Sequence, residues 1–172
     1  MKKFIFLLLL LLTLTACGRD TAPEDTAKFY YPLQEITLGS NSTSISFEER
    51  DRGNNSVQDL LSVYLKGPQT NTLTNPFPAD ISLISLLTED GKSSLILSDS
   101  YASLTGLDLS LANASLAQTV LGLTGSEEAI ISCESKTLDG ESHIAINKDD
   151  LILLDESIGP ANANDATSST TE

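Results

Sequence analysis

The 172-residue sequence has no tryptophan, a single histidine and two cysteines, and aromatic residues make up 5% of the chain. With so few aromatic residues, we expect leucine and isoleucine to build the core of the folded domain. The lone histidine, His143, has no second histidine with which to form a zinc site, and no Gly-x-Ser-x-Gly elbow accompanies it. These absences argue against a zinc enzyme and a serine hydrolase. The scarcity of aromatic rings also argues against a site that stacks sugars.

Basic residues are scarce as well: 10 lysines and arginines stand against 24 aspartates and glutamates, for a formal net charge of −14. A protein that binds nucleic acid needs a basic surface for the phosphates, so nucleic acid is an improbable partner. An anionic lipid surface attracts polybasic segments and therefore disfavours this composition. We expect the domain to stand away from a bilayer rather than lie on it.

The most informative stretch of the chain is at its start. Lys2 and Lys3 precede an apolar run, residues 4–12, which is too short to span a bilayer because a span takes about 20 residues. The run leads to Leu14-Thr15-Ala16-Cys17. This order of charged, apolar and small residues resembles a bacterial lipoprotein signal peptide that ends in a lipobox.

The resemblance implies that residues 1–16 are removed and that Cys17 is acylated with diacylglycerol as the first residue of the mature chain. Two acyl chains would give the two signals that stable anchoring requires. A disulfide between Cys17 and Cys133 is disfavoured, because Cys17 lies in a polar stretch far in sequence from any core. The mature chain would carry 8 basic and 24 acidic residues, a charge of −16. We expect it on the extracytoplasmic face of a cell membrane.

Polarity divides the remainder of the chain into three parts. Residues 17–28 are polar and lack apolar periodicity, which predicts a tether with a mean reach of roughly 18 Å. Residues 156–172 are small and polar, and we expect them to form a disordered acidic tail. Residues 29–155 remain as one folded domain, which is large enough for a single core.

Six strands and a tight hairpin turn are predicted within this domain, with a further short strand at residues 151–154. Residues 29–38 and 43–49 alternate apolar and polar side chains, the second with one face toward water. Residues 81–88 and 92–98 flank Asp90-Gly91, a pair typical of a type I′ hairpin turn. If Glu89 pairs with Lys92, Leu86 faces Leu95 and Ile84 faces Leu97. Later strands are expected at residues 128–134 and 142–147, the latter after a turn at Asp139-Gly140.

Two helices complete the expected fold. Val57, Leu60, Leu61, Tyr64 and Leu65 recur at helical spacing, with Ser56 and Asp59 as a capping box and Gly67-Pro68 as the end. A second helix is expected over residues 109–123, capped by Ser110 or Asn113 and stopped by Gly125. The order of these elements predicts an α+β two-layer sandwich, a small mixed or antiparallel sheet with both helices on one face.

Three segments carry a resemblance to a known family. Tyr30-Tyr31 match an aromatic strand, Leu65-Lys66-Gly67-Pro68 match a helix end, and Gln118 to Thr124 match a later helix; in this order and spacing they resemble the GerMN domain of sporulation and spore germination lipoproteins. The resemblance implies a fold similar to ring-building motifs, with helices on a three-stranded sheet. It implies self-association or entry into an envelope complex, and it implies no catalytic residues.

Other motifs favour structural interpretations. Gly91-Lys92-Ser93 lacks the earlier glycine of a phosphate-binding loop, because that position is Leu86. We expect Cys133 to be a small buried apolar residue and His143 to lie at the surface. The acidic pairs match no calcium loop, and neighbouring carboxylates on a strand point to opposite faces, so we expect solvated charges. These pairs are Glu48-Glu49, Glu127-Glu128 and Asp149-Asp150.

Together these observations predict a non-enzymatic lipoprotein with a GerMN domain, anchored to the membrane at Cys17, with no cofactor and no metal. Its partners would be envelope proteins or further copies of itself, as a scaffold or assembly component, with sporulation or germination as the setting that the resemblance implies. The alternative is a lipoprotein that binds a small ligand or a glycan, which would need a concave apolar pocket with convergent polar groups. An enzyme is a more distant third possibility.

Overall fold

The computed structural model describes residues 26–34 and 44–151 of the chain. The signal peptide, Cys17, most of the expected tether and the expected acidic tail lie outside these residues. None of the helices in the described ranges is both long and apolar enough to cross a membrane. The elements in chain order are β1 (Thr26–Pro32), β2 (Ile45–Asp51), α2 (Val57–Tyr64), β3 (Leu83–Glu89), β4 (Lys92–Leu97), η1 (Asp99–Ser103), α3 (Gly106–Thr124), β5 (Glu128–Cys133), β6 (Ile144–Asn147) and η2 (Lys148–Leu151).

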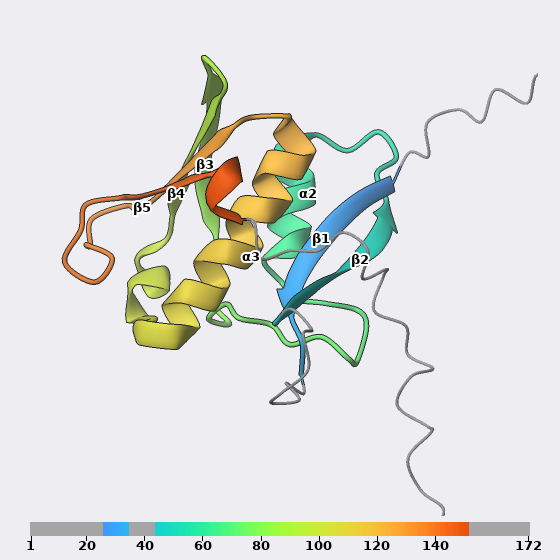
Figure 1. Cartoon of the computed structure of the whole chain (residues 1–172), viewed down its shortest axis with the longest axis horizontal. Helices are drawn as coiled ribbons and strands as arrows, with labels where there is room; N and C mark the ends of the chain where they lie inside the picture. Colours follow the sequence, from blue (N-terminus) through green and yellow to red (C-terminus); the bar gives the residue numbers. More distant parts are fainter. Residues whose placement is uncertain (1–25, 35–43, 152–172) are drawn as a thin grey trace, which may run out of the picture.

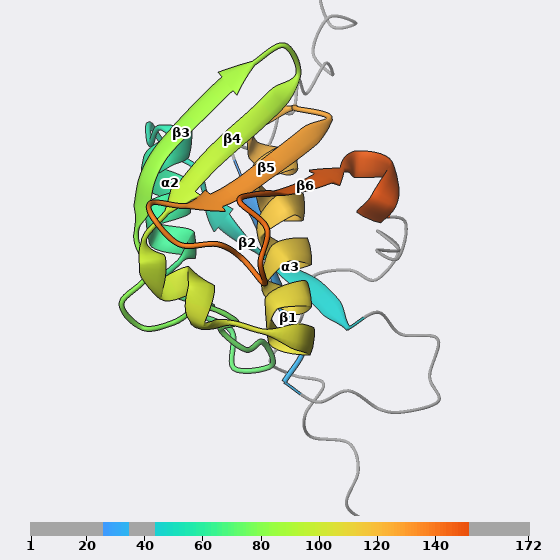
Figure 2. The ribbon, with the colours of Figure 1, turned by 90° about the vertical axis from the view of Figure 1, so that its left-hand side faces the viewer.

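The main sheet has four strands in the order β3-β4-β5-β6. Strands β4 and β5 are parallel and α3 connects them, whereas the two outer pairs are antiparallel. Helices α2 and α3 lie on one face of this sheet (Figures 1 and 2). The predicted α+β class and the placement of both helices are confirmed, and the sheet has one strand more than the resemblance implies.

Strands β1 and β2 form a separate antiparallel pair that covers the opposite side of the helices (Figure 1). The helices therefore lie between two sheets, which adds a third layer to the predicted two. The reason lies in α3, which is buried on more than one side. Leu116 and Val120 belong to the main core, while Leu111 and Ala114 pack against Tyr30 and its neighbours on β2.

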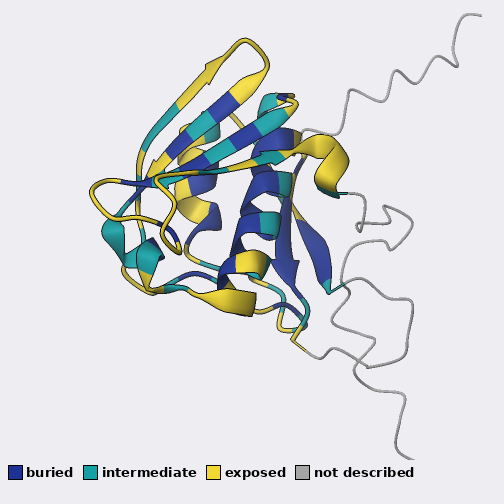
Figure 3. Ribbon diagram, turned by 60° about the vertical axis from the view of Figure 1, so that its left-hand side comes forward, coloured by how far each residue is buried: buried dark blue, intermediate teal, exposed yellow. Residues whose placement is uncertain are grey.

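The centre of the core is aromatic, although aromatic residues are few. Every phenylalanine and tyrosine in the described ranges is buried. Figure 3 shows that buried residues run along the strands and helices where the two sheets and the helices meet. Phe29, Tyr31, Tyr64, Phe77 and Tyr101 form a connected row, with ring centroids 4.8–6.4 Å apart between neighbours. Leucine and isoleucine make up most of the main core cluster, as expected, and the aromatic residues add a group within it that was not predicted from the sequence.

The hairpin turn has the predicted geometry. Asp90 and Gly91 both have positive φ, 50° and 74°, as a type I′ turn requires. The predicted pairs Glu89 with Lys92 and Leu86 with Leu95 are confirmed.

The pairing of Ile84 with Leu97 is wrong. The register shifts between Leu83 and Ser85, so Leu83 faces Leu97 and Ile84 lies in an irregularity with 45% of its surface exposed. A β-bulge adds one residue to one strand of a pair, and so it displaces the alternation that the sequence pattern assumes.

Both helices begin with N-cap residues in extended conformation. In α2, Ser56 and Asp59 form the predicted capping box: the Asp59 amide donates to Ser56 Oγ at 3.2 Å and the Ser56 amide donates to Asp59 Oδ2 at 3.2 Å. In α3, Thr105 is the N-cap, so neither Ser110 nor Asn113 has that role.

The exposure of the first turn of α3 explains why its start was predicted too late in the sequence. Its first turn faces solvent, with Leu107 71% exposed, so the apolar periodicity becomes visible only from Leu109. The helix ends at Gly125, which has φ 72°, as predicted.

The ends of the domain also differ from expectation. β1 begins at Thr26, inside the segment 17–28 that we expected to be a tether. Residues 36 and 38 of the expected first strand lie outside the described residues. At the other end, Leu151 closes the 3-10 helix η2 rather than opening a strand, and residues 152–154 lie outside the described part.

Candidate functional site

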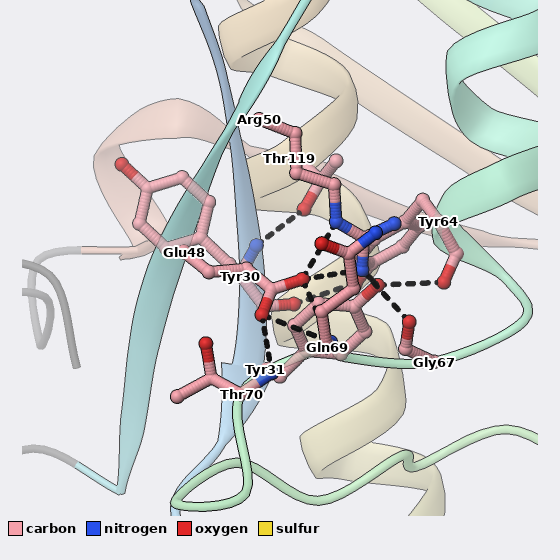
Figure 4. A network of polar contacts seen from close by, with 9 residues as sticks. All are labelled: Tyr30, Tyr31, Glu48, Arg50, Tyr64, Gly67, Gln69, Thr70 and Thr119. Carbon is pink, nitrogen blue, oxygen red and sulfur yellow. Dashed lines mark hydrogen bonds and ion pairs between the residues drawn. The ribbon is translucent and has the colours of Figure 1, made fainter. Parts of the chain in front are cut away.

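The most elaborate polar arrangement in the described residues surrounds Glu48 on β2 (Figure 4). Glu48 is 5% exposed. Its carboxylate accepts hydrogen bonds from the Arg50 guanidinium, from the Gln69 amide at 3.0 Å and from the Thr70 amide at 2.9 Å. The expectation of a solvated charge and of a wet face is wrong for the first half of this strand, because residues 45–48 are buried on both faces of β2, whereas Glu49 is exposed.

Burial alone would raise the pKa of the Glu48 carboxyl. The hydrogen bonds from Arg50 and from the amides of Gln69 and Thr70 outweigh it and hold the pKa below its ordinary value. The carboxylate is therefore charged at neutral pH, and donors already surround it. A general base must be free to accept a proton from a substrate, and this carboxylate is not.

Arg50 connects the carboxylate to the loop after α2. Its Nη2 donates to the carbonyl of Gly67 at 2.8 Å, and the guanidinium lies over the ring of Phe29, 4.8 Å from the centroid. Gly67 has φ 103°, a conformation that favours glycine. The loop that begins at Gly67 is thus held against β2 by hydrogen bonds between its backbone groups and the side chains of Arg50 and Glu48.

In the core, the hydroxyl groups of Tyr31 and Tyr64 form hydrogen bonds that join β1 to α2. The Tyr31 hydroxyl donates to the Tyr64 carbonyl at 2.7 Å, and the Tyr64 hydroxyl donates to the Tyr30 carbonyl at 2.8 Å. The amide of Tyr30 donates to Thr119 Oγ1 on α3 at 3.0 Å. Burial is the main cause that raises the pKa of both hydroxyls, Tyr31 and Tyr64, so they remain protonated donors.

The three segments on which the family resemblance depends meet in this network. Tyr30-Tyr31 come from β1, Gly67 follows α2, and Thr119 lies in the middle of α3. Tyr30 and Tyr31 bond β1 to both helices, and Arg50 on β2 bonds to the loop at Gly67. The motifs are accordingly a signature of the fold, and their polar groups serve one another rather than a substrate.

The remaining candidates from the sequence stay separate. His143 is exposed, with Nδ1 3.1 Å from Ser142 Oγ. Cys133 is a free, buried cysteine of the core cluster, and burial raises the pKa of its thiol. These placements match the surface and core roles expected for the two residues.

Gly91-Lys92-Ser93 lies in the hairpin turn and the start of β4, as the structural interpretation predicts. Ser93 is fully buried, and its hydroxyl is 2.8 Å from Ser126 Oγ and 3.0 Å from Thr124 Oγ1. This hydroxyl cluster attaches the end of α3 to β4. Lys92 forms an ion pair with Glu128 at 2.6 Å, so its charge faces a carboxylate rather than an anion site.

The acidic pairs divide as the strand geometry predicts. Glu48 is buried while Glu49 is exposed, and Glu127 and Glu128 pair with different lysines, Lys148 at 3.7 Å and Lys92. Within the described ranges, no three histidine, cysteine or carboxylate side chains gather in a way that could hold a metal ion.

The surface of the described residues has open hollows, two of which are candidate ligand sites. One, of about 450 Å³, lies between β2 and α2 and is lined by Glu49, Asp51 and Asp59 among others. The other, of about 540 Å³, is lined by Pro76, Phe77 and Leu104 among others. A small-molecule site is usually an apolar cavity into which several polar groups, some with shifted pKa values, point. Neither hollow has this form.

Sequence reasoning missed the pair Glu48 and Arg50. The signal was present, since two oppositely charged residues stand two positions apart on a strand and therefore share a face. Their burial depends on the amides of Gln69 and Thr70, about twenty residues later, and no local pattern announces this contact.

Comparison with known proteins supports the fold. No protein-family model matches the chain, and no curated protein matches it. Among solved structures, the tandem GerMN domains of the sporulation protein GerM from Bacillus subtilis match with a TM-score of 0.51 and 19% identity, over 70% of this chain and 44% of that chain. A Clostridium perfringens protein described as a lipoprotein matches with a TM-score of 0.44 and 16% identity, over 73% of this chain and 88% of that chain.

The described part of the chain is thus an α+β domain whose helices pack on a mixed sheet. More particularly, it has a GerMN-like fold, as the motifs in the sequence predicted. The chain spans less than half the length of the tandem GerMN protein that it matches.

Proposed function

We propose that this protein is a lipoprotein anchored at Cys17, with a GerMN-like domain that acts as a non-enzymatic scaffold or assembly component of the cell envelope. The observation that carries the proposal is the order of features in one chain. A lipobox ending at Cys17 is followed within nine residues by the first strand of a GerMN-like fold.

The chemistry of the domain supports a role without catalysis. Glu48, Tyr31 and Tyr64 have shifted pKa values, and such groups often mark active sites. Here each of them is hydrogen-bonded to protein groups in the interior of the fold. Structural networks also perturb pKa values, and this one is a structural network.

Charge supports the proposed location. The mature chain would carry −16, so an anionic membrane surface would repel the domain, and the anchor would hold it near that surface without adsorption. The extracytoplasmic face then gives access to other envelope proteins. Sporulation is the setting that we propose, by analogy with the GerMN protein of similar fold.

Fatty-acid labelling of the full chain in a bacterial host tests the anchor. We expect the protein to incorporate label and to fractionate with membranes, and Cys17→Ser to lose both properties. Cys133→Ser is the matched control, because it removes the other cysteine and should leave labelling intact. An unlabelled, soluble parent chain would refute the anchor.

Chemical cross-linking in intact cells tests the assembly role. The protein should be recovered in complexes with itself or with another envelope protein. A chain that is membrane-bound but yields only uncross-linked monomer would refute the scaffold role and leave the anchor standing. Deletion of the gene from a spore-forming host should reduce spore formation or germination, and unchanged spores would exclude that setting.

A further inference from the structure

Strand β3 is an edge of the main sheet, and it is hydrogen-bonded to β4 alone within the described ranges. It lies at the margin of the sheet in Figure 2, and the hairpin that it forms with β4 projects beyond the body of the domain. An edge strand presents a row of backbone N–H and C=O groups that can pair with another strand.

From Ser85 onward this edge lacks the usual protection, because the bulge at Ile84, which can turn an edge away from pairing, affects only the start of the strand. The seven residues of β3, LISLLTE, contain no proline and no lysine, and their one charged residue is Glu89 at the turn end. Leu87 and Ile84 are 56% and 45% exposed. The opposite edge, β6, is only four residues long and is followed directly by Lys148, Asp149 and Asp150. Short length and nearby charge are the features with which proteins block edge pairing.

We propose that two copies of the protein associate by antiparallel pairing of their β3 strands about a two-fold axis at Leu86. The inference rests on the proposed anchor, which would confine both copies to one surface. Pairing of this kind joins the two four-stranded sheets into one continuous sheet of eight strands.

The sequence of β3 is complementary to itself in this register. Within the regular part of the strand, which begins after the bulge at Ile84, residues at equal distances from Leu86 become neighbours, so Ser85 of each copy faces Leu87 of the other. Residues that face each other across an antiparallel pair point to the same side of the sheet. Each exposed Leu87 is therefore placed beside a small side chain, and no two carboxylates are brought face to face.

The neighbouring strand extends the contact. Ser85 pairs with Ile96 on β4, and Ile96 is 37% exposed. In the dimer, Ile96 and the second copy's Leu87 would lie on either side of the small Ser85. Apolar side chains that each copy leaves in water would then be brought together on the outer face of the joined sheet.

Charge selects this surface for self-association. Two copies with a formal charge of −14 or more repel each other, and salt screens that repulsion beyond about 10 Å without removing it at contact. A contact between copies must therefore be poor in carboxylates, and β3 is poor in them except at Glu89.

Anchoring makes a weak contact sufficient. Confinement of copies to a membrane raises their effective concentration, as a linker does for two joined modules. An isologous contact about a two-fold axis closes at two copies and does not grow into a fibre.

Disulfide cross-linking in the full, membrane-bound chain tests the register. The double variant S85C/L87C should give a covalent dimer on mild oxidation, because facing Cβ atoms in an antiparallel pair are about 4.5–5.5 Å apart. Within one strand, the Cβ atoms of residues two positions apart are separated by about 6.6 Å. A disulfide needs Cβ atoms about 3.5–4.5 Å apart, so a bond within one copy is disfavoured.

The control is A145C/N147C, which places two exposed cysteines at the same spacing on β6. We expect several-fold more dimer from β3 than from β6 or from the parent chain. Equal dimer from both edges, or attachment of the β3 cysteines to a protein of another size, would overturn the proposal.

The fractionation of the same samples separates this result from the anchor. Membrane-bound protein without the β3 cross-link, but still recovered in lysine cross-linked complexes, would overturn the dimer and leave the proposed function intact. Protein found only in the soluble fraction would instead count against the anchor. A circular dichroism spectrum of each variant, matching that of the parent chain, confirms that the fold is retained.

Discussion

The hydroxyl of Tyr31 donates a hydrogen bond to the backbone carbonyl of Tyr64 at 2.7 Å, and the two rings lie 4.8 Å apart. The carbonyl belongs to the last residue of α2, where helix carbonyls lack partners within the helix. One tyrosine of β1 thus satisfies the end of a helix that lies more than thirty residues later in the chain.

Tyr31→Phe should destabilise the domain by about 1 kcal/mol, because it removes one of the two donors to the Tyr64 carbonyl and leaves only the Gly67 amide, at 3.0 Å. Urea unfolding of the variant measures the loss. Tyr64→Phe should cost a similar amount through the carbonyl of Tyr30. The double variant should cost less or more than the sum, because residues in contact are energetically coupled, and strict additivity would contradict a shared network.

Glu48→Gln should destabilise the domain by about 3 kcal/mol, since it leaves the largely buried Arg50 guanidinium, whose side chain is 11% exposed, without its counter-charge. Glu49→Gln is the matched control on the same strand; this neighbour is exposed, and the change should alter stability by less than about 0.5 kcal/mol. Denaturant unfolding at neutral pH compares the two, and equal effects would refute the role of the buried pair.

The same pair predicts a pH dependence. Because the folded-state pKa of Glu48 is lowered, its contribution to stability is complete above the ordinary glutamate pKa and is lost as the pH falls through the folded value. The parent chain should lose stability in this acidic window, and Glu48→Gln should lose less over the same range. Parallel curves for the two proteins would contradict the assignment.

Gly67→Ala should destabilise the domain by about 2 kcal/mol or more. Gly67 has φ 103°, and an added Cβ would lie 2.9–3.0 Å from the side chain of Asn75. Gly122→Ala is the control, because Gly122 lies in α3 with ordinary helical φ and open space around it. That change should stabilise the helix by about 0.5–1 kcal/mol, so the two alanines should shift the melting temperature in opposite directions.

Ser56→Ala should cost about 1 kcal/mol, since it removes the capping box at the start of α2. Ser62→Ala in the same helix should be neutral or slightly stabilising, because that hydroxyl only donates to the carbonyl of Gln58 within the helix. Thermal unfolding followed by circular dichroism distinguishes the two, and equal losses would show that the cap has no special weight.

Local chemistry accounts for what could be predicted from the sequence. The Asp90-Gly91 turn determines the register of the hairpin, and Ser56 with Asp59 determines the start of α2, because these signals act within four residues. The order of helices and strands follows from periodicity, and with three motifs it was enough to predict the GerMN-like fold.

The predictions that were wrong concern features that depend on contacts between segments far apart in the sequence. Ile84 lies in a bulge that no turn residue announces, and Glu48 is buried because amides from another loop bond to it. The third layer could not be predicted either, because a helix that is buried on several sides loses the single apolar stripe by which its packing is inferred. Of the proposed functional residues, Cys17 lies outside the described part and depends on the sequence alone.

The position of β1 has a mechanical consequence. The described fold begins at Thr26, so a pull on the N-terminal end of the chain enters the domain through this strand. The load is divided at once between the ladder to β2, the bond from Tyr30 to Thr119 on α3 and the bond from Tyr31 to α2. A domain tethered at that end would be gripped by the strand that is bonded to both of its helices, rather than by a strand that could peel away alone.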